Sequence, residues 1–289
     1  MRPSSVRSYL ADATEQLRDA GVPTPANDAR LLAAHLLGVK PLDLMFTDVP
    51  DSFAGEYAQL IERRATREPL QHITGTAPFG PHTLTVGSGV FIPRPETEII
   101  AQWGASLLAD APSHPPTAID LGTGSGAIAL YLSEAVAGAR VIGVDKQAQA
   151  LEYARRNAPG VEFVQGDMTD VELLRELDGQ VDVIVANPPY VPETPDLDPE
   201  VYFDPHEAVF SGADGMEAIR GLVPVAARLL KPGGHLGIEH DDSTSQAVQD
   251  VVRAHGAFGQ VRALADLAGR DRFVVASKLP LCPPQPTTA

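Results

Sequence analysis

Short apolar runs alternate with helical stretches from Thr117 onward, and this rhythm limits the possible folds more than any other feature. Seven runs are rich in aliphatic and β-branched residues, and segments with helical character separate most of them. The runs are TAIDL, RVIGVD, VEFVQ, VDVIVA, HLGIE, QVRALA and RFVVAS. Strand–helix alternation is typical of a mostly parallel sheet with helices on both faces. The sequence therefore predicts an α/β fold built on a seven-stranded, doubly wound sheet.

Residues 1–75 have a different pattern, which predicts a separate, small helical domain. Apolar residues recur there every three or four positions in three stretches, the last of them from Phe53 to about Arg64. In the second stretch His35 falls on the apolar stripe, and we interpret it as a core residue. The N-terminal domain is therefore expected to have its own hydrophobic core.

The rest of the chain divides at two changes of composition. Residues 76–93 alternate β-forming residues with glycine and proline, which favours a β-hairpin linker between two domains. The doubly wound domain is then expected to cover residues 94–280. Residues 281–289 are rich in proline and lack periodicity, so we expect a disordered tail.

Charge and cysteine content exclude several classes of protein. The 289 residues include 22 Lys and Arg against 38 Asp and Glu, a formal charge of −16, whereas nucleic-acid binding calls for clustered positive charge. The single cysteine, Cys282, excludes an intramolecular disulfide and any cysteine-based metal site. The N-terminus lacks the apolar region of a secretory signal, and no apolar run is long enough to span a membrane. We expect a cytoplasmic protein without membrane contact.

A glycine-rich loop follows the first predicted strand of the sheet, in the segment AIDLGTGSGAIAL. Glycine lets a backbone turn tightly and approach a ligand closely, so Gly122, Gly124 and Gly126 indicate a nucleotide-type loop. The next strand ends in Asp145, a carboxylate suited to the two hydroxyls of a ribose. The loop also fits the relaxed dinucleotide fingerprint, so a dehydrogenase stays possible at this point. Asp120 favours a cationic, amine-bearing ligand over a pyrophosphate.

The most informative segment is VDVIVANPPYV, where an apolar strand runs directly into Asn187-Pro188-Pro189-Tyr190. The fourth strand of a doubly wound sheet lies beside the first, so this motif should meet the glycine loop. The prolines fix the backbone and remove two N–H donors. Hydrogen-bond acceptors remain at the Asn187 side chain and the Pro188 carbonyl, which suits a planar –NH₂ group. Tyr190 supplies an aromatic wall.

Four motifs in this order resemble class I S-adenosylmethionine-dependent methyltransferases that methylate amino groups: DLGTGSG, VIGVD, QGDM and NPPY. Further segments resemble one family among them, the peptide chain release factor glutamine N5-methyltransferases. They are EPLQHITG at 68–75, FIPRPETE at 91–98, EAVFSGADGMEAI at 207–219, LKPGGHLGIE at 230–239 and DLAGRDRFVVA at 266–276. The resemblance covers nearly the whole chain, including the helical domain, and RPETE is its most discriminating motif.

The resemblance implies a set of site residues and partners. S-adenosylmethionine would lie against Gly122, Thr123, Gly124, Ser125, Gly126, Asp145, Asp167, Met168 and Asn187, and S-adenosylhomocysteine would be the product. The substrate glutamine would be held by Asn187, Pro188, Pro189 and Tyr190, with Asn187, Pro188 and Tyr190 acting in catalysis and no metal required. The implied partner is a class 1 release factor, methylated in its Gly-Gly-Gln loop and contacted elsewhere by the N-terminal domain. We expect a monomeric enzyme that does not bind nucleic acid directly.

Two alternatives stay open. DNA adenine N6-methyltransferases also use NPPY, although residues 76–289 carry 14 basic and 28 acidic side chains, which disfavours a DNA groove. The basic run Arg63, Arg64 and Arg67 is interpreted as a solvated helix face. The other alternative is a protein that binds the release factor without modifying it.

The chain departs from the family pattern at two places. Met168 stands where an aromatic residue is common, which would weaken stacking against adenine. The segment EHDDSTSQ at 239–246 replaces a Glu–aliphatic–Gly turn. Its residues His240, Asp241 and Asp242 are interpreted as a solvated loop and not as a metal site, because three consecutive residues rarely converge on one ion.

Overall fold

The computed structural model describes residues 6–194 and 197–280, which form two compact units. The first unit extends to Thr76 and also includes two later segments, Val86–Ser88 and Leu197–Phe203. The second unit contains Ala77–Thr85, Gly89–Asp196 and the chain from Asp204 onward. The tail predicted for residues 281–289 lies outside the described residues.

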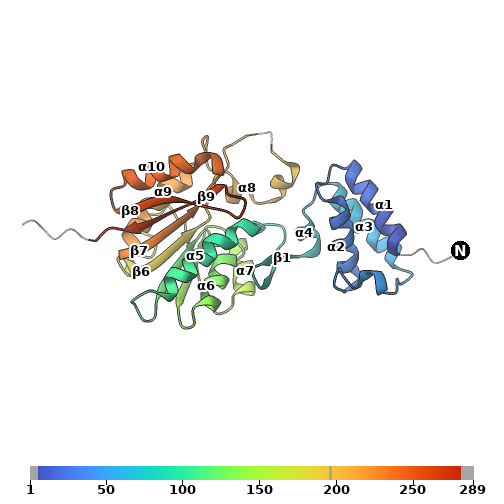
Figure 1. Cartoon of the computed structure of the whole chain (residues 1–289), viewed down its shortest axis with the longest axis horizontal. Coiled ribbons are helices and arrows are strands. Elements are labelled where there is room, and N and C mark those ends of the chain that lie inside the picture. Colours follow the sequence, from blue (N-terminus) through green and yellow to red (C-terminus); the bar gives the residue numbers. More distant parts are fainter. Residues whose placement is uncertain (1–5, 195–196, 281–289) are drawn as a thin grey trace, which may run out of the picture. The chain divides into compact units, whose positions relative to one another are not determined.

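The first unit is helical, as predicted. Its helices are α1 (Val6–Asp19), α2 (Pro25–Leu37), α3 (Phe53–Ala65) and α4 (Leu70–Thr74) (Figure 1). Their apolar faces enclose a separate core, which includes Leu17, Leu32, Leu44, Phe53, Tyr57 and Ile61. Near this core Tyr57 donates a hydrogen bond from its hydroxyl to the Ala29 carbonyl at 2.8 Å.

Two interpretations of this unit were wrong. His35 is exposed, because the buried face of α2 runs through Asp28, Ala29 and Leu32 instead. Arg64 is buried and not part of a solvated face: its side chain is 3% exposed and its Nε lies 2.8 Å from Asp28 Oδ2. Its Nη2 lies 2.7 Å from Oε1 of Glu200, a residue of the later segment that completes the unit. Paired carboxylates allow a guanidinium to be buried.

The predicted hairpin is present as β1 (Thr76–Phe79) and β2 (His82–Thr85), which form a two-stranded sheet. The chain then passes through a short 3-10 helix, Pro95–Thr97, in the RPETE motif. α5 (Glu98–Ala109) follows directly and leads to the first strand of the large sheet.

All seven predicted strands of the large sheet are present. They are β3 (Thr117–Leu121), β4 (Arg140–Asp145), β5 (Glu162–Gln165), β6 (Val181–Ala186), β7 (Leu230–Glu239), β8 (Phe258–Ala265) and β9 (Asp271–Lys278). Their order is β5-β4-β3-β6-β7-β9-β8, with parallel pairs from β5 to β7 and antiparallel pairs at β9. β3 lies beside β6, so the glycine loop and the NPPY motif follow neighbouring strands at the same edge.

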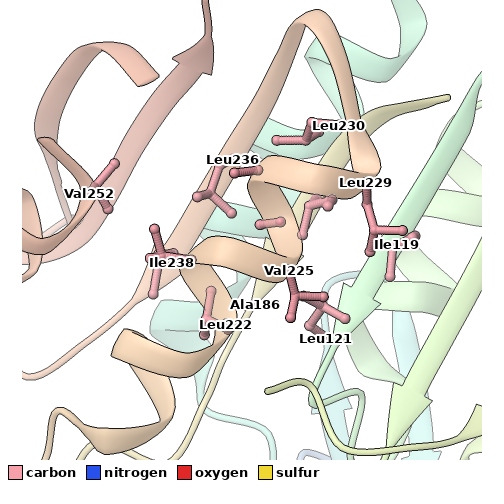
Figure 2. Packing of buried hydrophobic residues seen from close by; sticks show 14 of the residues in the cluster. Ile119, Leu121, Ala186, Leu222, Val225, Leu229, Leu230, Leu236, Ile238 and Val252 are labelled. Atoms are coloured by element: carbon pink, nitrogen blue, oxygen red, sulfur yellow. The ribbon is translucent and has the colours of Figure 1, made fainter. Parts of the chain in front are cut away.

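Helices cover both faces of this sheet, which confirms the doubly wound fold. One face carries α5, α6 (Ala127–Ala135) and α7 (Ala148–Asn157), and the other carries α9 (Glu217–Leu229) and α10 (Ser245–Ala254) (Figure 1). A four-residue helix, α8 (His206–Val209), lies before α9. Figure 2 shows Leu222, Val225 and Leu229 of α9 packed against strand residues of the main core. None of the helices within residues 6–194 and 197–280 is long and apolar enough to cross a membrane.

Candidate active site

The glycine loop between β3 and α6 is held against the end of β4. The backbone N–H groups of Gly122 and Thr123 both donate to the Val144 carbonyl at 2.9 Å. Gly122 and Gly126 have φ angles of 80° and 82°, in the left-handed region that favours glycine. A Cβ on Gly126 would lie 3.1 Å from the Cα of Ala154 in α7, so the loop also needs glycine for close packing.

Asp145, at the end of β4, supports the middle of the same loop. Its Oδ2 accepts a hydrogen bond from the Gly124 N–H and its Oδ1 accepts one from the Gln147 N–H, both at 2.8 Å. Burial raises the pKa of Asp145 above its ordinary value, although these backbone bonds oppose the rise. No atom lies within 4 Å of the position that a Cβ on Gly124 would take. The loop therefore has open space at Gly124, beside a carboxylate with lone pairs to spare.

Met168 and Asn187 converge on the other end of the loop. A Cβ on Gly122 would lie 2.8 Å from Met168 Cε and 3.2 Å from the Asn187 carbonyl oxygen. Asp167 precedes Met168 and accepts hydrogen bonds from the hydroxyl and the backbone N–H of Thr169. Burial alone would raise the pKa of Asp167, but these bonds and the Lys146 ammonium lower it. Residues from three loops thus meet at Gly122.

The NPPY motif follows β6 without a break. Pro188 is buried, whereas Asn187, Pro189 and Tyr190 are half-buried. The next residue, Val191, donates from its N–H to the Val209 carbonyl at 3.0 Å and accepts from the Ser211 N–H at 2.9 Å. These bonds anchor the motif to the EAVFSGADGMEAI segment.

Gly215 of that segment packs directly on the motif. Its φ is 72°, and a Cβ there would lie 2.2 Å from the Tyr190 carbonyl oxygen, too close for any side chain. The backbone of the NPPY motif is therefore fixed on two sides, by β6 before it and by residues 209–215 after it.

Comparison with known proteins assigns the chain to a family. Residues 8–75 match the family model of the PrmC N-terminal domain, and residues 115–265 match that of a methyltransferase domain. The release factor glutamine methyltransferase of Corynebacterium glutamicum is 53% identical over 277 residues, which cover 93% of this chain and 98% of the relative. That of Mycobacterium tuberculosis is 48% identical over 282 residues, covering 95% and 92%. The chain belongs to the release factor glutamine methyltransferase family.

A solved structure agrees with the methyltransferase fold. The catalytic domain of hMettl16 has a TM-score of 0.51 and 15% identity, over 68% of this chain and 75% of that one. At this identity the likeness shows the fold alone. In the large sheet β9 runs antiparallel to both of its neighbours, so β8 runs in the same direction as the parallel strands.

One carboxylate beside the glycine loop, Asp120, forms hydrogen bonds within the loop itself. Asp120 is fully buried, and its Oδ2 accepts hydrogen bonds from the Thr123 hydroxyl at 2.6 Å and the Ala129 N–H at 3.1 Å. It therefore ties the glycine loop to the first turn of α6 through Oδ2, while its buried Oδ1 has no hydrogen-bond partner among the described residues. Burial raises the pKa of Asp120 to about 7.

A second buried acid, Glu239, was missed as an individual site residue. It ends β7, is 2% exposed, and accepts a hydrogen bond from the Tyr190 hydroxyl at 3.4 Å. Burial raises the pKa of Glu239 to about 7. The only sequence signal for it was its place at the end of the LKPGGHLGIE motif.

The segment after Glu239 also differs from the solvated loop that was predicted from the sequence. His240 is fully buried and its Nδ1 lies 2.8 Å from the Asp241 carbonyl oxygen, so this residue is not part of a solvated loop. Its backbone N–H donates to the Arg272 carbonyl on the neighbouring strand, which draws the residue inward. Within the part of the chain that the structure describes, no group of three or more His, Cys, Asp or Glu residues could hold a metal ion.

The two raised carboxyl pKa values predict how stability changes with pH. Asp120 and Glu239 keep their protons in the folded state up to about pH 7, whereas unfolded carboxyls lose them near pH 4. Their stabilising contribution is therefore complete below about pH 4 and is lost as the pH rises through 7. Chemical denaturation of the wild type should show the unfolding free energy falling over this window.

The variant Asp120→Asn tests the assignment, because the asparagine oxygen can still accept from Thr123 and Ala129. This variant should reduce the slope of the unfolding free energy against pH by up to about 1.4 kcal/mol per pH unit between pH 5 and 7. Asp250→Asn, which replaces an exposed carboxyl on α10, is the matched control. An unchanged slope in Asp120→Asn would show that this carboxyl does not titrate near pH 7.

Proposed function

We propose that this chain transfers a methyl group from S-adenosylmethionine to the side-chain amide nitrogen, N5, of the glutamine in the Gly-Gly-Gln loop of class 1 peptide chain release factors. The observation that carries the proposal is the meeting of two loops at the carboxyl edge of the sheet. The Asn187 carbonyl lies against Gly122, so the NPPY acceptors follow β6 directly beside the glycine loop of β3. Relatives named release factor glutamine methyltransferases support the choice of substrate.

The residues of the glycine loop fit S-adenosylmethionine. Gly124 has open space above it, and Gly122, Thr123, Ser125 and Gly126 form a turn that cannot carry bulk at its tightest points. Asp145 can accept from ribose hydroxyls with the lone pairs that its two backbone bonds leave over. Asp167 and Met168 are proposed to lie along the adenine, which the packing of Met168 over Gly122 supports. When bound, S-adenosylmethionine supplies an electrophilic methyl group on its sulfonium.

The chain's own contribution is to orient the amide. An amide nitrogen is a poor nucleophile because its lone pair is delocalised into the carbonyl, so geometry matters more than a strong base. The Asn187 side-chain oxygen and the Pro188 carbonyl would each accept one N–H of the –NH₂ group and turn its face toward the methyl group. Alignment of this kind can lower a barrier by about 7–11 kcal/mol in favourable cases. After methyl transfer the nitrogen releases one proton to solvent, because the new bond makes that proton acidic.

The helical unit is proposed to recognise the release factor away from its glutamine. It has a core of its own, a nearly balanced charge of 8 basic and 10 acidic side chains in residues 1–75, and matches the PrmC N-terminal domain. Because release factors act on ribosomes, we place the enzyme in the cytoplasm. We also propose that it works as a monomer, without direct binding of nucleic acid.

Replacing Asp145 by alanine is expected to weaken S-adenosylmethionine binding about tenfold to 150-fold. The loss of a hydrogen bond to a charged group amounts to about 1.5–3 kcal/mol. Calorimetry with S-adenosylmethionine and S-adenosylhomocysteine measures it. Asp145→Asn keeps one acceptor and should have a smaller effect, while Asp250→Ala, on the exposed face of α10, is the control. Binding of NAD, with no response to either sulfur compound, would favour a dehydrogenase instead.

A further inference from the structure

Glu239 is a buried acid at the carboxyl end of β7, next to the carboxyl end of β6. β6 and β7 run parallel with Ala186 opposite Ile238, so Glu239 is level with Asn187, the first residue of the NPPY motif. A Cβ at Gly237 would contact Trp103 and Ile100 of α5. Since residues two apart in a strand share a face, Glu239 lies on the α5 side of the sheet.

The two ends of the Glu239 carboxylate have different surroundings. Oε1 accepts the hydrogen bond of the Tyr190 hydroxyl at 3.4 Å. Oε2 is buried and has no hydrogen bond of normal geometry in the described part of the chain, although the Thr97 hydroxyl lies near enough to lower the pKa of the acid. Glu96 of the RPETE segment raises the pKa of Glu239 and Arg272 of β9 lowers it.

A buried acid with an incompletely paired oxygen is costly for a core position. A leucine of similar volume would pack on α5 without that cost, so stability alone does not account for a glutamate at this position. What the glutamate supplies is an acceptor for Tyr190. Burial and the charge of Glu239 raise the pKa of Tyr190, so its hydroxyl stays protonated and donates.

Tyr190 is joined to Asn187, which carries the first substrate acceptor, by two rigid residues. Pro188 and Pro189 have fixed φ angles, and Gly215 holds the Tyr190 carbonyl from the other side. The direction of the Tyr190 side chain, set by rotation about its Cα–Cβ bond, is the freedom that remains in this part of the motif, and the hydrogen bond from its hydroxyl to Glu239 restricts it.

We propose that Glu239 is a positioning residue for methyl transfer, which fixes the Tyr190 side chain of the NPPY motif. This proposal rests on the proposed glutamine methylation.

The test compares Glu239→Leu, Glu239→Gln and Tyr190→Phe with the wild type, using intact release factor and S-adenosylmethionine. Glu239→Leu should lower kcat at least tenfold with an unchanged Kd for S-adenosylmethionine, and Glu239→Gln, which keeps an acceptor, should restore most of it. Tyr190→Phe should lower kcat as much as Glu239→Leu does. The double variant, Tyr190→Phe with Glu239→Leu, should lower kcat no further than either single variant. Glu162→Gln, an exposed glutamate of β5 in the same sheet, is the matched control.

The pH profile of kcat adds a readout that a merely structural role would not change. A step near pH 7 in the wild type should disappear in Glu239→Gln, whose neighbours Tyr190, Glu96 and Arg272 are unchanged. Full kcat in Tyr190→Phe, or additive losses in the double variant, would overturn the proposal even if Glu239→Leu fails to fold. If the wild type methylates no release factor glutamine, the proposed function fails first and this proposal fails with it.

Discussion

Replacing Asn187 by alanine is expected to lower the rate of methyl transfer to a release factor about 10²–10³-fold, the usual cost of losing one preorganised polar group at a reacting centre. Asn187 is half-buried at the end of β6, and its backbone carbonyl lies against Gly122. The alanine keeps that backbone in place and removes only the side-chain acceptor for the –NH₂ group. The amide can then rotate away from the methyl group.

Single-turnover kinetics with labelled S-adenosylmethionine measure this effect, with cofactor binding by calorimetry as the check that the site is folded. Gln180→Ala is the matched control, because Gln180 is an exposed amide just before the opposite end of the same strand. A rate for Asn187→Ala within a few fold of the wild type would show that the side chain does not orient the substrate.

Replacing Arg64 by alanine is expected to destabilise the helical unit by about 3–5 kcal/mol, since it leaves the buried carboxylate of Asp28 without its partner. Arg64 also pairs with Glu200, so the variant loosens the segment Leu197–Phe203 that completes the unit. Hydrogen exchange in α1, α2 and α3 measures the loss. Arg63→Ala is the control: Arg63 is largely exposed beside Glu68, where an ion pair contributes about 0–1 kcal/mol.

Arg64→Ala also tests the proposed recognition role, and it does so more cleanly than deleting residues 1–75. The deletion would leave Leu197–Phe203 without its packing partners. We expect Arg64→Ala to bind S-adenosylmethionine normally and to methylate intact release factor poorly. Undiminished methylation with an unfolded helical unit would contradict the recognition role. Unchanged hydrogen exchange would contradict the account of the buried pair.

The strands and the glycine loop could be predicted because their causes are local. Each strand is a short apolar run between turns. A fully buried strand such as β6 is identified by its continuous apolar run and its short length. The loop was visible because Gly122 and Gly126 must adopt positive φ angles, which few other residues tolerate. The placement of the fourth strand beside the first followed from the general topology of doubly wound sheets, and β6 does lie beside β3.

The buried polar residues could not be predicted, because their partners are distant in sequence. From the sequence, Arg64 is one of three basic residues on a helix, and its burial depends on Asp28 and Glu200, which are 36 and 136 positions away. Glu239 is similar: Tyr190 lies 49 positions before it. The bonds of Asp120 to Thr123 and Ala129 could not be predicted for a different reason, since a carboxylate before a glycine loop suits a ligand as well as it suits the loop itself.

Helical periodicity identified α2 but not which of its residues face inward. A stripe through Leu32 and His35 and one through Asp28, Ala29 and Leu32 differ by a small rotation about the helix axis. The structure has the second, because Asp28 must reach Arg64. A hydrophobic pattern would not place an aspartate on the buried face.

The central claim is that the methyl acceptor is a protein glutamine. The most direct measurement incubates the wild-type chain with isotopically labelled S-adenosylmethionine and, in separate reactions, with bacterial release factor and with unmethylated duplex DNA. Mass spectrometry of the digested release factor should find one added methyl group, on the glutamine of the Gly-Gly-Gln loop, and no label in the DNA. Label on DNA adenine with an unmodified release factor would contradict the account.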